Sequence, residues 1–116
     1  MPFDGISYEP VSPVTQMLID GKQQLQRGWC QRIMRRRGSV CIIGSLAVAD
    51  FDVFAEAEKF LLEAIRDYGY SYSSVAEFND DISRTKEQVL EVYDRAIELS
   101  LPVIERLWFS RELLAA

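Results

Sequence analysis

Apolar residues recur at helical spacing along most of the chain. Residues 14–25, 54–68, 75–78, 89–97 and 103–114 place apolar side chains three or four positions apart, the spacing of one helix face. For three of these helices the predicted buried faces are Val14, Met17, Leu18, Gly21 and Leu25, then Phe54, Ala57, Leu61, Ala64, Ile65 and Tyr68, then Val89, Val92, Tyr93, Ala96 and Ile97.

Residues that commonly begin or end helices flank these stretches. The expected N-caps are Ser12, Asp50 or Asp52, Ser74 and Thr85, the last paired with Gln88 in a capping box. Gly28 and Gly69 are the expected stops of the first two long helices. Pro102 lacks an amide hydrogen, so it should break or kink the helix that precedes it.

Two short runs after the first helix predict a β-hairpin. Residues 40–44 form an uninterrupted apolar and β-branched run, and residues 29–34 alternate less regularly. Gly38, in the polar connection between them, can adopt a positive φ. Because an isolated hairpin is marginal in water, we expect an α+β fold that is mostly helical, with one β-hairpin packed by four to five helices.

The length of 116 residues fits one domain. Three prolines among residues 1–13 predict an extended N-terminal arm, followed by a single globular domain over residues 14–116 with a C-terminal helix after Pro102. The sequence has no apolar run long enough to cross a bilayer and no signal-peptide pattern at its start, so we expect a cytoplasmic protein with no membrane partner.

The net charge of −5 is unevenly distributed. Residues 22–37 hold six cations and no acids, whereas residues 50–98 hold thirteen acids and five cations. The molecule should therefore have one basic pole and one acidic side. The acidic remainder disfavours general nucleic-acid binding, which usually needs a positive field.

The two cysteines and the absence of histidine limit the chemistry. A zinc site needs about four ligands, mostly Cys and His, so we expect no metal and no cofactor. Cys30 and Cys41 are expected to be small buried residues. The alternative is that one of them is a nucleophile, activated by Arg32 or by a nearby helix start.

A second candidate site is a polar cluster at residues 79–85. The functional interpretation is a pocket in which Asp80 acts as a base or acceptor near the cysteines; its candidate residues are Trp29, Cys30, Cys41, Asn79, Asp80 and Arg84. The alternative is helix capping, in which these side chains hold free backbone groups at the ends of two helices.

Two surface candidates complete the set. Arg32, Arg35, Arg36 and Arg37, named here the basic tip, are suited to phosphates or an acidic protein surface, or else are solvated charges that protect a strand edge. Trp108, Phe109, Leu113 and Leu114 place apolar side chains on more than one face of the last helix, which favours either a homodimer or closure of the domain's own core.

A resemblance adds to this picture. The Trp29-Cys30 pair, the Cys41-Ile-Ile-Gly44 run, Phe78-Asn79-Asp80 and Arg84-Thr85 resemble the pattern of an uncharacterised domain family of bacterial and phage proteins over about residues 14–98. This chain has Phe78 where that pattern has tryptophan, and it adds a C-terminal helix. The resemblance implies a fold but no activity, and it assigns no catalytic residue.

We therefore expect a small non-enzymatic cytoplasmic interaction or regulatory protein that acts through protein contacts. One alternative is a cysteine- or carboxylate-dependent enzyme with a pocket near Cys30, Cys41, Asn79 and Asp80. A second alternative is a protein that contacts nucleic acid through the basic tip.

Overall fold

The structure is a computed structural model and describes residues 11–46 and 50–102. Within these residues the chain forms five helices and one antiparallel two-stranded hairpin, as the α+β prediction required. The elements are α1 (Pro13–Arg27), β1 (Arg35–Arg36), β2 (Ser39–Val40), α2 (Ile42–Ser45), α3 (Phe51–Asp67), α4 (Val75–Asp80) and α5 (Lys86–Ser100).

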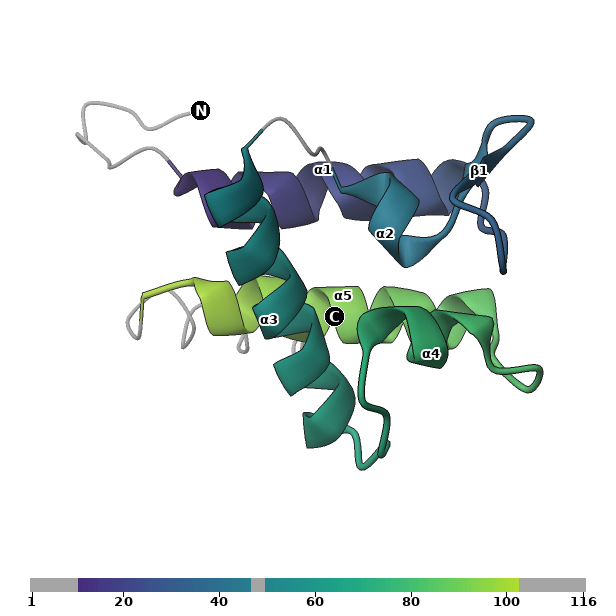
Figure 1. Cartoon of the computed structure of the whole chain (residues 1–116). Helices are drawn as coiled ribbons and strands as arrows, with labels where there is room; N and C mark the ends of the chain where they lie inside the picture. Colours follow the sequence, from purple (N-terminus) through teal and green to yellow (C-terminus); the bar gives the residue numbers. More distant parts are fainter. Residues whose placement is uncertain (1–10, 47–49, 103–116) are drawn as a thin grey trace, which may run out of the picture.

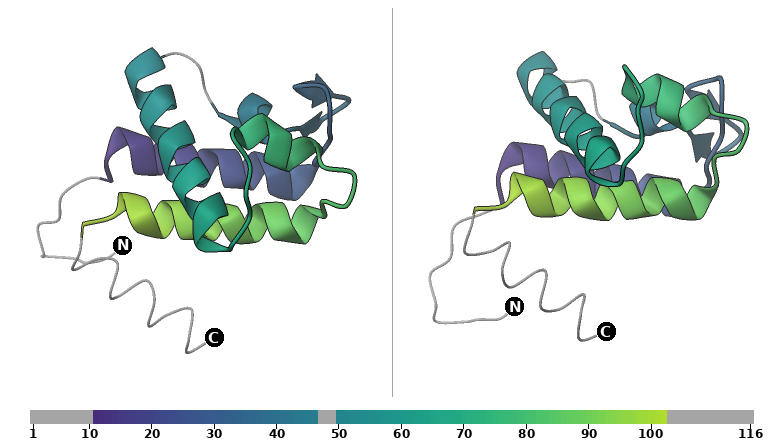
Figure 2. Two further views of the ribbon diagram at one scale, coloured as in Figure 1. Left: turned by 60° about the horizontal axis from the view of Figure 1, so that its bottom comes forward. Right: turned by 90° about the horizontal axis from the view of Figure 1, so that it is seen from below.

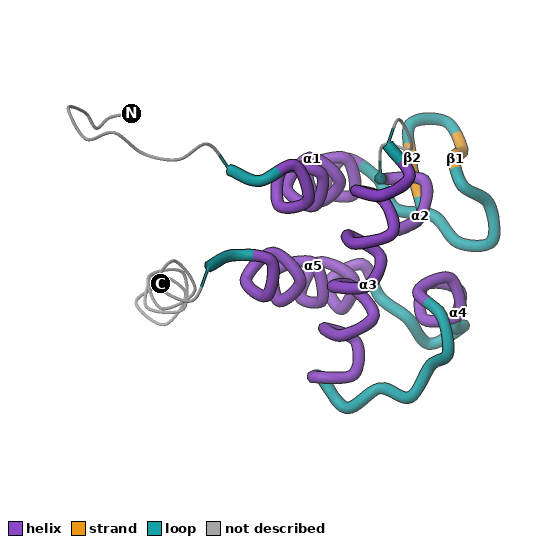
Figure 3. Tube along the Cα trace, turned by 60° about the vertical axis from the view of Figure 1, so that its left-hand side comes forward, coloured by secondary structure: helices purple, strands orange, loops and turns teal. Residues whose placement is uncertain are grey.

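Helices α1 and α5 lie side by side and α3 crosses both of them (Figures 1 and 2). The α1–α5 pair is antiparallel, because Thr15 near the start of α1 bonds to Ser100 at the end of α5, while Lys86 at the start of α5 bonds to the carbonyl of Gln26. The hairpin, α2 and α4 gather at the end of the pair where α1 finishes and α5 begins (Figures 1 and 3). The functional candidates lie at this end.

The core is formed by the three long helices together with α2 and α4. Nearly all of the predicted helix faces are buried, including all five positions predicted for α5. Tyr68 is an exception: it was predicted to be buried, but it is 49% exposed because α3 ends at Asp67 and the chain turns away at Gly69.

The helix ends follow the predicted capping residues. The side chains of Ser12, Asp50 and Ser74 each accept backbone amides at the starts of α1, α3 and α4. Thr85 and Gln88 form the complete capping box of α5. α5 ends at Ser100, two residues before Pro102; residues 1–10 of the predicted arm and the predicted helix after Pro102 lie outside the described residues.

The hairpin is shorter than predicted, and the strand prediction for residues 40–44 was wrong beyond Val40. Residues 42–45 form α2 instead, with the Cys41 Sγ accepting the amide of Gly44 at 3.3 Å. Because this short helix lies among the other helices, it buries the apolar run that a strand would also have buried. Residues 29–34 do not pair along their length either; Trp29 makes one isolated parallel bridge to Val40.

The turn of the hairpin requires left-handed backbone at two adjacent residues. Arg37 has a φ of 48° and Gly38 has a φ of 87°, the combination expected in a two-residue hairpin turn. Gly28, by contrast, has an extended backbone, and the glycine is needed for space: a Cβ there would lie 2.6 Å from Ser39 Oγ. The hairpin therefore packs directly on the end of α1.

A buried polar contact joins α1, α2 and α5. The hydroxyl of Tyr93, which is completely buried, forms a hydrogen bond with Ser45 Oγ, and burial raises the pKa of Tyr93 far above its ordinary value. A Cβ on Gly21 would lie 2.8 Å from this hydroxyl and 3.2 Å from the Ser45 carbonyl oxygen. Gly21 thus allows α1 to approach the Tyr93–Ser45 pair.

We expect Gly21→Ala to destabilise the protein by about 1–3 kcal/mol, although Gly to Ala ordinarily stabilises a helix interior. The Cβ would force apart the tightly packed groups around Tyr93. Urea unfolding of Gly21→Ala, Tyr93→Phe and the double variant measures this effect. Since Tyr93→Phe removes the nearest atom, Gly21→Ala should cost less in that background; an equal cost would contradict the proposed clash.

Candidate functional site

The amide side chain of Asn79 is the centre of the candidate site. It is 1% exposed and lies in α4. Its Oδ1 accepts hydrogen bonds from Trp29 Nε1 at 2.8 Å and from the Ile42 amide at 3.1 Å. Its Nδ2 donates to the Cys30 carbonyl at 3.2 Å and to Asp80 Oδ1 at 2.9 Å. One side chain therefore ties the chain after α1 and the start of α2 to α4.

Neighbouring polar groups extend this connection. Asp80 Oδ1 also accepts the amide of Arg32 at 2.8 Å. Gln31 Nε2 donates to the carbonyls of Asn79 at 2.9 Å and Asp81 at 2.8 Å. Arg32 has a φ of 69°, a left-handed conformation that is costly for a side chain with a Cβ. These bonds hold the strained residue in place and set the direction of the chain that follows it.

A pocket of about 250 Å³ opens between the hairpin segment and α4. Its lining residues are Arg32, Ile33, Met34, Cys41, Ile43, Ala76, Asn79 and Asp80. Three of the six predicted pocket residues, Cys41, Asn79 and Asp80, therefore line one pocket. Trp29, Cys30 and Arg84 do not line it. The pocket also has an apolar wall that was not predicted, to which α4 contributes Ala76 and α2 contributes Ile43.

Both cysteine sulfurs form hydrogen bonds with the backbone. Cys30 Sγ donates to the Ile33 carbonyl at 3.3 Å, and burial, together with the nearby Cys41, raises the pKa of its thiol. A raised pKa reduces the thiolate fraction at neutral pH, which is the opposite of what nucleophilic activation requires. Cys41 Sγ caps α2, as described above. Among the described residues, no group of three potential ligands is placed to hold a metal ion.

Arg84 belongs to a separate aromatic cluster. Its guanidinium lies 3.8 Å from the ring centroid of Phe78 and 4.6 Å from that of Tyr70, and its Nε donates to the Phe78 carbonyl at 2.8 Å. Tyr72 completes the cluster: its hydroxyl accepts a hydrogen bond from Arg84 Nη2 and donates one to the Asp81 carboxylate. Arg84 is only 6% exposed. Its hydrogen bonds and ring contacts give it a structural role. No pattern in the sequence predicted this cluster.

Asp81 is the acceptor at the end of this cluster. Ser83 Oγ at 2.6 Å, the Tyr72 hydroxyl, and the Ser83 amide at 2.8 Å all donate to its carboxylate. These hydrogen bonds hold the pKa of Asp81 well below its usual range, and the bond to Asp81 raises the pKa of Tyr72.

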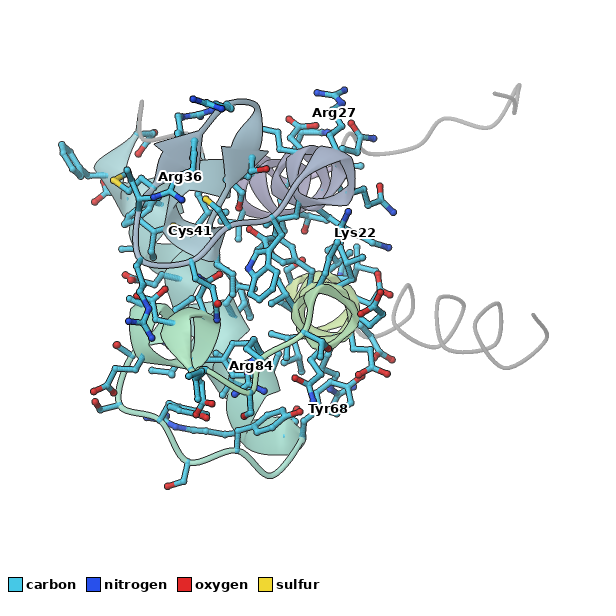
Figure 4. All side chains as sticks on the ribbon, turned by 90° about the vertical axis from the view of Figure 1, so that its right-hand side faces the viewer. Lys22, Arg27, Arg36, Cys41, Tyr68 and Arg84 are labelled. Atoms are coloured by element: carbon cyan, nitrogen blue, oxygen red, sulfur yellow. The ribbon has the colours of Figure 1, made fainter. Side chains whose placement is uncertain are left out.

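The basic tip is exposed. Arg32, Arg35, Arg36 and Arg37 form no side-chain hydrogen bond or ion pair with any other described residue. Ile33 and Met34, which separate Arg32 from Arg35, are 44% and 51% exposed. Figure 4 shows Arg36 well separated from Arg84. Elsewhere Lys22 pairs with Asp94, and Arg95 pairs with Asp67 and Glu98.

The predicted oligomer contacts, Trp108, Phe109, Leu113 and Leu114, lie outside the described residues. No helix within residues 11–46 and 50–102 is long and apolar enough to cross a membrane.

Comparison with known families identifies the family of this chain. The model of a family described as "Family of unknown function (DUF6197)" matches residues 9–99. The chain belongs to DUF6197. The match confirms the expectation of an uncharacterised domain family and covers nearly the same residues as the resemblance in the sequence. Neither the curated proteins nor the solved structures contained a significant match to this DUF6197 chain.

We expect Asn79→Ala to destabilise the domain by about 2–4 kcal/mol, because the buried Ile42 amide and the Trp29 indole would lose their shared acceptor. Trp29→Phe keeps an aromatic ring and removes only one donor, so it should cost about 1 kcal/mol. Urea unfolding followed by circular dichroism compares the two. Equal costs would show that the Asn79 amide is not the central connection.

Acid should remove the stabilisation that the Asp81 contacts provide. A carboxyl with a lowered folded-state pKa stabilises the folded state above its unfolded pKa of about 4, and this contribution is lost as the pH falls toward the folded pKa. We therefore expect Asp81→Asn to be less stable than wild type at about pH 7, with the difference shrinking toward about pH 3. Unfolding midpoints measured across this range, with Glu87→Gln as the control, check it. A difference that grows in acid would contradict the assignment.

Proposed function

We propose that this DUF6197 domain is a small non-enzymatic cytoplasmic protein that binds another protein through its basic tip. The observation that carries the proposal is the combination of four exposed arginines, whose side chains form no hydrogen bond or ion pair with any described residue, and two exposed apolar side chains between Arg32 and Arg35. Arginine forms paired hydrogen bonds with carboxylates and is enriched where proteins meet. An acidic protein surface is the partner that this chemistry favours.

The way the basic tip is supported also favours binding. Gln31 and the backbone of Arg32 are bonded to α4, and β1 pairs with β2 through a tight turn. A partner therefore meets a loop whose backbone is already ordered, so less conformational entropy is lost on binding.

The enzyme alternative has less support. The Cys41 sulfur and the Asp80 carboxylate share one pocket, but the sulfur caps α2 and the carboxylate accepts two hydrogen bonds that hold the backbone together. The Cys30 thiol has a raised pKa. Each candidate group already has a structural role.

We expect Arg35→Ala/Arg36→Ala to abolish capture of a partner from an extract of the source cells while leaving the melting temperature within about 2 °C. Both residues are exposed strand positions, so truncation removes charge without exposing the core. Arg37 is left in place because alanine would be strained at its positive φ. Affinity capture followed by mass spectrometry is the measurement.

The matched control is Lys59→Ala/Arg66→Ala, which removes the same charge from exposed positions on α3. It should retain the partner. If both double variants lose the partner, or if both keep it, the result would count against a specific contact at the basic tip. Capture that disappears after nuclease treatment would favour the nucleic-acid alternative instead.

A further inference from the structure

The pocket beside the basic tip has the size of a side-chain site. Its volume of about 250 Å³ is below the roughly 300–1,000 Å³ of pockets that hold drug-sized ligands or cofactors. Ile33, Met34, Ile43 and Ala76 provide an apolar wall. A single aliphatic or aromatic side chain suits this space, as in the buried anchor of a protein interface.

The pocket walls are held by the Asn79 contacts. Ala76, Asn79 and Asp80 occupy positions i, i+3 and i+4 of α4, so they lie on one face of that helix. The opposite wall is the segment after Arg32, whose amide bonds to Asp80. The small side chain of Ala76, which is exposed, leaves the space between the two walls open.

The charged residues at the pocket indicate which residues should flank a side chain that binds in it. Both the Asp80 carboxylate and Arg32 line the pocket, and a second carboxylate placed beside Asp80 would be repelled by it. The side chains of Arg32, which lines the pocket, and of Arg35 and Arg36 in the adjacent strand β1 form no ion pair with any described residue, so they can bind carboxylates that flank such a side chain. We infer that this pocket takes one apolar side chain from an acidic segment of a partner protein, whose flanking carboxylates bind the basic tip. The inference rests on the proposed function and specifies the chemistry of its partner.

A second copy of this chain is a less suitable occupant. The acidic residues of this protein lie mainly in residues 50–98, whereas the basic tip lies at the hairpin and the pocket lies between the hairpin segment and α4. Pairing the two would bring together different surfaces of the two copies, a head-to-tail contact that either closes into a ring or continues into a filament.

The test begins with the full chain immobilised and a phage library of random peptides. We expect the enriched peptides to carry one large apolar residue flanked by Asp or Glu. An enriched peptide is then titrated by fluorescence anisotropy against wild type and Ala76→Trp, which fills the pocket from an exposed position. Ala55→Trp, the same change at an exposed alanine of α3, is the matched control.

Ala76→Trp should weaken the peptide about tenfold or more, while Ala55→Trp should change its affinity less than about twofold. Replacing the central apolar residue of the peptide with serine should cost about as much as Ala76→Trp. Met34→Ser, which makes the wall polar at a half-exposed position, is a second variant in case Ala76→Trp perturbs α4.

Each other outcome is informative. The pocket inference would be overturned, and the proposed function left standing, by acidic peptides whose affinity falls with Arg35→Ala/Arg36→Ala but is unchanged by the serine substitution in the peptide and by Ala76→Trp. Binding that is also insensitive to Arg35→Ala/Arg36→Ala would overturn both. Enrichment of peptides without acidic residues, or self-association in light scattering that Ala76→Trp abolishes, would overturn the acidic-partner assignment.

Discussion

The hydrogen bonds of one buried amide hold together the end of the molecule that contains the hairpin, α2 and α4. A fully buried polar side chain is costly unless its donors and acceptors are paired, and Asn79 pairs with four groups from three parts of the chain. Because the hairpin is only two residue pairs long, its own ladder contributes little. Its attachment to α4 through Asn79, Asp80 and Gln31 is what gives it a defined position.

This attachment explains how a short surface loop can have a defined backbone conformation. The left-handed backbone at Arg32 redirects the chain so that Ile33 and Met34 line the pocket, and the four arginines stay in solvent. The polar groups in the pocket wall are used for support. The exposed side chains of the basic tip thus make no hydrogen bond or ion pair within the described residues, while Cys41, Asn79 and Asp80 hold the backbone.

The prediction of the helices was largely confirmed because the signals that define them are local. Ser12, Asp50, Ser74 and Thr85 each cap the helix predicted for them, since a cap needs only backbone amides two or three residues away. The apolar spacing of α5 identified its buried face completely. The family match over residues 9–99 likewise agrees with the expectation of an uncharacterised domain family.

What the sequence determined by itself was therefore the set of long helices, their capped ends, the α+β class and the residue types gathered at one basic pole. The tertiary structure alone decided that residues 42–45 are helical, because burial of an apolar run does not distinguish a strand from a short helix. It also decided that Asn79 and Asp80 connect to Trp29, Cys30 and Arg32, while Arg84 stacks on an aromatic cluster instead. These contacts join residues that are distant in the chain or depend on how the segments pack, and the sequence contains no local signal for them.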